Sequence, residues 1–145
     1  MVAKSSTLDN QLLALIFNGT TAATLFQNVT SGALTNLYMS LHTASPAAGG
    51  SQTTNEAAYP GYARVAVART SGGFTVSGSS VTLTAACTFP TATGSPSETE
   101  TYAAVGTASS GAGQILYFGP LNSSIVVNAA GITPQLTTGT TITES

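Results

Sequence analysis

Residues 37–42 alternate apolar and polar side chains in the order Leu37-Tyr38-Met39-Ser40-Leu41-His42. Because successive side chains of a β-strand point to opposite faces, the three apolar residues share one face and the three polar residues share the other. This pattern predicts a half-buried strand whose apolar face packs on a core.

More short stretches of strand-like sequence follow, separated by turn residues such as Gly and Pro. They lie at residues 62–69, 74–77, 80–86, 99–107, 114–119, 125–128 and 140–144. Residues 43–58 are rich in Ala, Ser, Gly, Pro and Thr without any periodicity, which predicts a long loop. Many short strands without strand–helix alternation favour an all-β fold, an antiparallel, jelly-roll-like β-sandwich.

One short helix is expected near the N-terminus, with Thr7 or Asp9 as its N-cap. Apolar residues at helical spacing predict it at about residues 8–17: Leu8, Leu12, Leu15 and Ile16. Leu13 and Phe17 lie off this face, so the helix is either deeply packed or in contact with another chain. We therefore predict an N-terminal arm with the helix at 1–32 and a sandwich at 33–145, within a single domain.

The composition excludes several classes of function. Only 6% of the 145 residues are charged, and three cations spread along the chain cannot form the basic patch that nucleic acid requires. The single cysteine, Cys87, excludes an internal disulfide or a cysteine-rich metal site, and we interpret it as a small core residue. No stretch approaches the roughly 20 apolar residues of a membrane span. We expect no cofactor, metal, nucleic-acid partner or membrane partner.

The residues that could carry acid–base chemistry are few. His42 is the only imidazole, and no nucleophile motif accompanies it, so we interpret it as a structural residue that hydrogen-bonds the adjoining loop. Glu98 and Glu100 are two apart and would face the same way on a strand, but their small polar neighbours favour a solvated loop edge. We assign no catalytic residue.

Glu56 and Arg64 flank a tight segment in a chain that has few other charges. An arginine next to strand residues is partly buried, and a buried arginine needs a partner. Glu56 is the nearest acid in sequence, so one hypothesis is an ion pair that fixes the loop to the strand. The alternative is that Arg64 contacts a partner chain.

Several motifs together resemble those of small structural proteins from tailed double-stranded-DNA bacteriophages. These are LYMSLHTASP (37–46), NE (55–56), YPGYARVAV (59–67), FPTATG (89–94), VGTA (105–108), GQILY (113–117) and GITP (131–134). Members of this family are often labelled tail or tail-fibre proteins. The chain's size and strand pattern also resemble the head cement proteins of Bordetella-phage-type podoviruses, which coat the capsid and clamp neighbouring major capsid subunits. The resemblance implies a virion structural role without enzymatic activity.

Of these roles, the sequence favours a cement or decoration protein on the outer surface of the head. A surface of small uncharged residues can be buried with little charge desolvation, and few long side chains lose rotamer freedom on assembly. Such a surface suits protein–protein contact in the head and in the tail equally. The expected partners are the major capsid protein and further copies of the chain, with Leu13, Phe17 and Arg64 as candidate contacts. The alternative is a tail component, either a fibre module or a neck adaptor.

Overall fold

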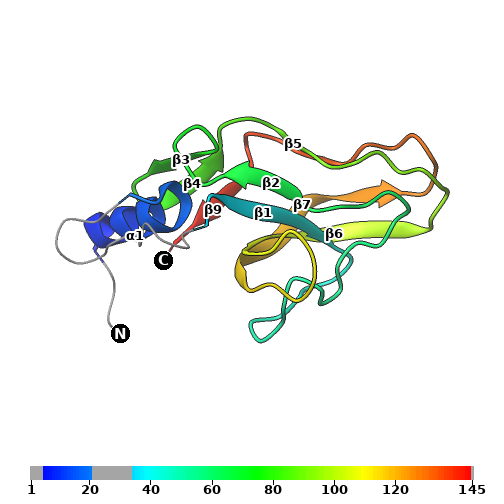
Figure 1. Cartoon of the computed structure of the whole chain (residues 1–145), viewed down its shortest axis with the longest axis horizontal. Coiled ribbons are helices and arrows are strands. Elements are labelled where there is room, and N and C mark those ends of the chain that lie inside the picture. Colours follow the sequence, from blue (N-terminus) through cyan, green and yellow to red (C-terminus); the bar gives the residue numbers. More distant parts are fainter. Residues whose placement is uncertain (1–4, 21–33, 145) are drawn as a thin grey trace. The chain divides into compact units, whose positions relative to one another are not determined.

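The computed structural model describes residues 5–20 and 34–144, and most of their regular structure is β-strand (Figure 1). The elements are α1 (Ser6–Asn18), β1 (Asn36–His42), β2 (Val65–Ala68), β3 (Phe74–Ser77), β4 (Ser80–Leu83), β5 (Cys87–Thr88), β6 (Glu98–Gly106), β7 (Ile115–Val127), β8 (Gln135–Leu136) and β9 (Thr141–Thr143). The strand pairs whose register is defined are antiparallel. The prediction of an antiparallel, sandwich-like all-β fold with one short helix is confirmed.

Backbone contacts divide the chain into two compact units. The first unit comprises residues 1–36, 67–86 and 136–145, and the second comprises residues 37–66 and 87–135. The predicted boundary between residues 32 and 33 lies outside the described residues. No helix in the described ranges is long and apolar enough to cross a membrane.

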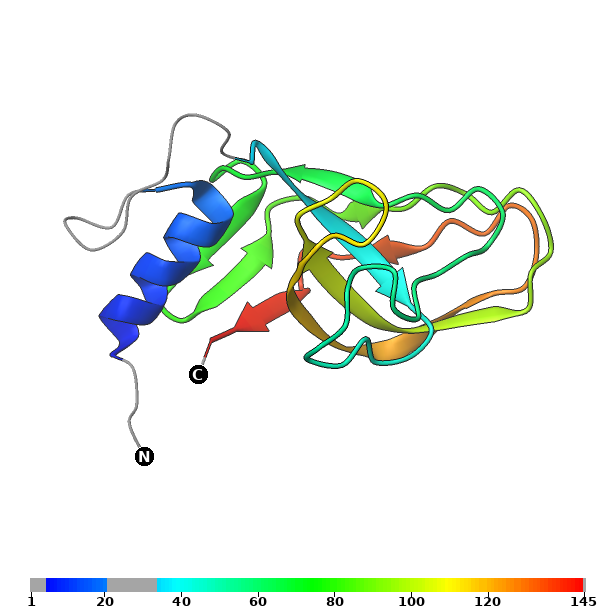
Figure 2. The ribbon, with the colours of Figure 1, turned by 60° about the horizontal axis from the view of Figure 1, so that its bottom comes forward.

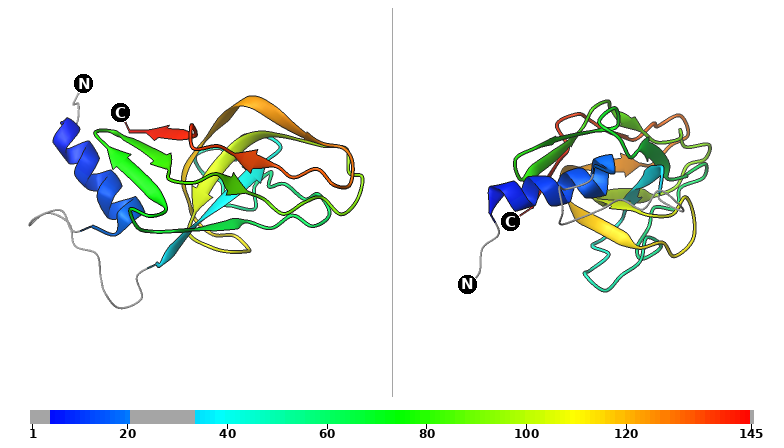
Figure 3. Two further views of the ribbon diagram at one scale, coloured as in Figure 1. Left: turned by 90° about the horizontal axis from the view of Figure 1, so that it is seen from above. Right: turned by 60° about the vertical axis from the view of Figure 1, so that its left-hand side comes forward.

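In the first unit, α1 packs beside the sheet β3-β4-β9 (Figure 2; Figure 3, left). The helix begins earlier than predicted, because the hydroxyl of Ser5 caps it by accepting a hydrogen bond from the Leu8 amide at 3.2 Å. It ends at Gly19, whose φ of 63° places it in the left-handed region that glycine tolerates. Arg69 donates to the carbonyls of Leu15 and Ile16, which completes the C-terminal end.

The side of α1 that faces the core differs from the predicted one. Leu13 and Phe17 are both fully buried, and Phe17 meets Phe74 edge-on with ring centroids 4.9 Å apart. Leu12 and Leu15, on the predicted apolar face, are only half-buried. Of the two alternatives given for Leu13 and Phe17, the structure shows deep packing, because their side chains are covered within their own chain.

The four-stranded sheet has the order β2-β1-β6-β7, and β5 pairs with β8. Strands β6 and β7 lie wholly in the second unit. Leu37, Met39 and Leu41 of β1 are buried, as predicted. Ser40 and His42 are also fully buried, so the prediction of a strand covered on one face only is wrong. The reason is that the loop after β1 folds back along its end, where the Thr43 amide donates to the Asn55 carbonyl at 2.9 Å.

Strand β7 replaces two strands that the sequence predicted at 114–119 and 125–128. Its partners on β6 shift from Tyr102, opposite Pro120, to Glu100, opposite Ile125, so residues 121–124 of β7 stand opposite Thr101 alone. Such a bulge bends a strand without ending it. Pro120, predicted to mark a turn, lies within β7 at the end of the sheet order, where a missing backbone donor is tolerated.

Candidate functional site

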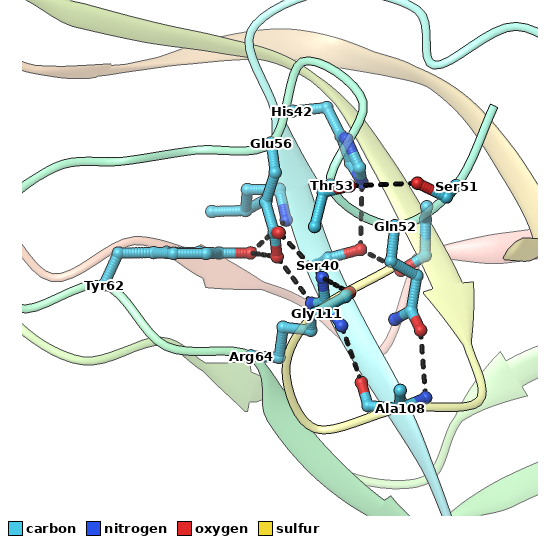
Figure 4. A network of polar contacts seen from close by, with 12 residues as sticks. Ser40, His42, Ser51, Gln52, Thr53, Glu56, Tyr62, Arg64, Ala108 and Gly111 are labelled. Atoms are coloured by element: carbon cyan, nitrogen blue, oxygen red, sulfur yellow. Dashed lines mark hydrogen bonds and ion pairs between the residues drawn. The ribbon is translucent and has the colours of Figure 1, made fainter. Parts of the chain in front are cut away.

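The hypothesised ion pair between Glu56 and Arg64 is present and is the centre of a polar network (Figure 4). Arg64 Nε donates to Glu56 Oε1 at 2.6 Å, and Arg64 Nη2 donates to Glu56 Oε2 at 2.7 Å. The Arg64 side chain is 2% exposed and that of Glu56 is 15% exposed. This forked geometry is the strongest form of an arginine–carboxylate contact.

The other donors of Arg64 reach a second loop, the segment between β6 and β7. Nη1 donates to the Ala108 carbonyl at 2.9 Å, and Nη2 donates to the Gly111 carbonyl at 2.8 Å. Glu56 also accepts a hydrogen bond from the Tyr62 hydroxyl at 3.1 Å, and that hydroxyl accepts one from the Leu41 amide at 3.1 Å. One guanidinium therefore holds two loops together, and little of its surface remains for contact with a partner chain.

His42 makes the expected hydrogen bond to the adjoining loop. Its Nδ1 lies 2.9 Å from the Thr54 carbonyl oxygen, which can only accept, so Nδ1 carries a proton. Its Nε2 lies 2.9 Å from Ser40 Oγ, and burial lowers the pKa of the imidazole. The neutral ring then accepts from the serine hydroxyl. Because Ser40 and His42 are both 0% exposed, no substrate can reach this pair in the structure.

Gln52, which the sequence analysis did not single out, is the second link between the two loops. It is fully buried, its Oε1 accepts from the Ala108 amide at 2.9 Å, and its backbone N–H donates to the Gly113 carbonyl at 2.9 Å. It belongs to a loop with no periodicity, so no local pattern marked it. Gly106 and Gly113 lie directly against its side chain, which explains why both positions lack a Cβ.

A Gly106→Ala variant is expected to lower the free energy of unfolding by about 1–3 kcal/mol, the usual cost of overpacking. The new Cβ would clash with Gln52 Cδ and would lie 2.6 Å from the Gln114 carbonyl oxygen. Urea unfolding measures the loss. The matched control is Gly119→Ala, where no atom lies within 4 Å of an added Cβ, and equal losses in the two variants would contradict the prediction.

The prediction that Glu98 and Glu100 form a solvated loop edge is wrong. Both lie in β6, and Glu100 is fully buried. Burial raises the pKa of Glu100 to about 8, and the neighbouring Glu98 adds to the increase. Glu98 Oε1 accepts a hydrogen bond from the Ala58 amide at 2.7 Å. The expectation of solvation failed because the loop over β6 comes from a distant part of the chain.

Cys87 is 3% exposed, as expected for a core residue, and burial raises the pKa of its thiol to about 12. Within the described ranges, no three His, Cys, Asp or Glu side chains gather into a group that could hold a metal ion. The hydrogen bonds of Arg64 and Gln52 described above position the two loops.

Comparison with known families places the chain. The family model described as podophage GP4 fiber I protein gp80 matches residues 3–143, nearly the whole sequence. No curated protein matches the chain. The resemblance to phage structural proteins is thereby supported, whereas the resemblance to head cement proteins is not confirmed. The chain belongs to the podophage GP4 fiber I protein gp80 family and is a structural protein of the podophage virion.

Proposed function

We propose that this protein is a structural module of the podophage tail fibre. The observation that carries the proposal is the family match, which spans residues 3–143 and whose description names a fibre protein. The family description thus favours the tail over the head surface that the sequence analysis preferred. Because the chain has no long repetitive shaft of its own, it is one module of a fibre.

The geometry supports a building block that binds other proteins. Hydrogen bonds from the buried side chains of Arg64 and Gln52 hold the loops at residues 43–58 and 107–114 in place. These loops therefore lose little conformational freedom on binding. The exposed parts of the two loops, such as Thr43, Thr53 and Ser110, are small and uncharged. Such a surface can be buried with little charge desolvation. The partners that fit it are further copies of the chain and other virion proteins.

Immunogold electron microscopy of purified particles, with an antibody against this chain, tests the location. We expect gold only on the tail fibres. Antibody absorbed with the purified protein is the control and should give no label. Gold spread over the head would contradict the proposal and favour a cement protein bound to the major capsid protein, while gold confined to the neck would favour an adaptor.

A further inference from the structure

Glu98 and Glu100 form a pair of carboxyl groups that the loop-fixing network does not use. They are two residues apart in β6, so their side chains extend from the same face of the strand. Glu100 is 0% exposed. Within the part of the chain that the structure describes, neither of its carboxylate oxygens receives a hydrogen bond from a donor. A fully ionised carboxylate in such a place would be strongly disfavoured.

The groups around the pair do not offer a compensating charge. Glu98 is the acidic neighbour that helps to raise the pKa of Glu100, and Tyr59 is the other titratable group that interacts with both carboxyls. The Tyr59 hydroxyl donates to the Pro90 carbonyl at 2.9 Å, so its proton is already used. Of the two arginines, Arg64 is held by Glu56, and Arg69 donates to the Leu15 and Ile16 carbonyls. A hydrogen bond between two carboxyl groups requires a proton on one of them.

We propose that Glu98 and Glu100 share one proton in the folded protein. This acid–carboxylate hydrogen bond would hold the loop that contains Ala58 in a pH-dependent way. Glu98 is the link, because it also accepts the hydrogen bond from the Ala58 amide. The hydrogen bond between the two carboxyl groups is present in acid and is lost when the shared proton dissociates. This proposal does not depend on whether the protein is a fibre module or a head protein.

A divalent cation between the carboxyls is the competing explanation. Calcium takes six to eight oxygen ligands, whereas this pair supplies four carboxylate oxygens, one of which already accepts from the Ala58 amide. The described residues also contain no third acidic, His or Cys side chain grouped with it. A shared proton needs neither further ligands nor further charge. It therefore explains, with the residues present, how two neighbouring carboxyl groups can be buried together.

The direction of the pH effect follows from proton linkage. The pKa of Glu100 is near 4.5 in an unfolded chain and about 8 in the folded protein, so the folded state holds more protons between these values. The stabilisation is complete below pH 4.5, declines as pH rises, and is lost once pH passes the folded pKa of about 8. In this interval the unfolding equilibrium constant rises by up to about tenfold per pH unit.

Two other titratable side chains, His42 and Cys87, limit the pH range in which the carboxyl pair can be measured alone. Burial lowers the pKa of His42 from 6.5, so His42 affects stability below that pH. Burial raises the pKa of the Cys87 thiol from 9.0, so its effect begins as the unfolded thiol ionises near pH 9. Urea unfolding of the full chain between pH 6.5 and 8 therefore isolates the carboxyl pair.

In that window we expect the wild-type protein to lose stability with rising pH and Glu100→Gln to lose much less, because glutamine mimics the protonated acid. Glu144→Gln removes the same charge after β9, in the other unit, and should keep the wild-type slope. Equal slopes in the wild type and Glu100→Gln would overturn the proposal. If Glu100→Gln does not fold, carbon-detected NMR of the wild-type carboxyl groups replaces it.

The NMR titration should show one glutamate carboxyl of the folded wild type changing near pH 8, and all glutamates titrating near 4.5 would overturn the proposal. Calcium or magnesium chloride at pH 8, with EDTA and matched sodium chloride as controls, tests the cation. No specific stabilisation by either metal is expected. A saturable rise in melting temperature that EDTA reverses, and that Glu100→Gln lacks, would overturn the shared proton in favour of a cation site.

Discussion

An Arg64→Met variant is expected to lose about 3–5 kcal/mol of unfolding free energy, the cost of breaking a buried ion pair by removing one partner. Methionine preserves much of the apolar volume of the arginine side chain. It leaves the Glu56 carboxylate, which is 15% exposed, without its cation. Among the contacts described above, only the Tyr62 hydroxyl still donates a hydrogen bond to this carboxylate. It also removes the donors to the Ala108 and Gly111 carbonyls. Chemical denaturation of the purified chain measures the loss.

Two companion variants separate charge from geometry. Arg64→Lys keeps the cation but lacks the fork, so it should recover only part of the lost stability. The double variant Glu56→Gln with Arg64→Met removes the stranded charge and should be more stable than Arg64→Met alone. In Arg64→Met, hydrogen exchange should accelerate in both loops that Arg64 holds, at residues 43–58 and 107–114. Wild-type stability in Arg64→Met would show that the ion pair does not hold the loops.

The ion pair could be predicted from sequence because charge is so scarce in this chain. With 6% charged residues, Arg64 had few possible acidic partners, and Glu56 was near in sequence. The alternation in residues 37–42 likewise predicted which side chains of β1 point to the core. Both inferences used local information, and local information determines strand periodicity and the nearest counter-charge.

What could not be predicted depends on contacts between distant segments. The burial of Ser40 and His42 requires the following loop to fold back over β1, and the burial of Glu100 requires residues near Ala58 to cover β6. Neither event leaves a periodic pattern. The bulge in β7 is another case, because Pro120 is a turn signal in isolation and an acceptable edge-strand residue once pairing with β6 is known.

The core-facing side of α1 was mispredicted for a related reason. Both the Leu12 side and the Leu13 side of the helix are apolar, so periodicity alone could not choose between them. The choice is made by the β3-β4 hairpin, whose Phe74 receives Phe17. This aromatic pair and the buried Leu13 place the helix against the hairpin in the first unit.

A Phe17→Ala variant is accordingly expected to lose about 3–5 kcal/mol, the usual cost of truncating a buried phenylalanine. Phe17 is 0% exposed, and its edge-on contact with Phe74 adds to the apolar area that the substitution removes. Phe118→Ala is the matched control, because Phe118 is 38% exposed and should lose much less. Urea denaturation followed by circular dichroism compares the two.

Hydrogen exchange locates the damage. In Phe17→Ala, protection should fall first in α1 and in the β3-β4 hairpin, because these are the elements that Phe17 joins. The amides of β6 and β7, which pair with each other in the second unit, should keep more of their protection. Equal destabilisation by Phe17→Ala and Phe118→Ala, or a loss of protection that begins in β6 and β7, would mean that the Phe17–Phe74 contact does not seat the helix.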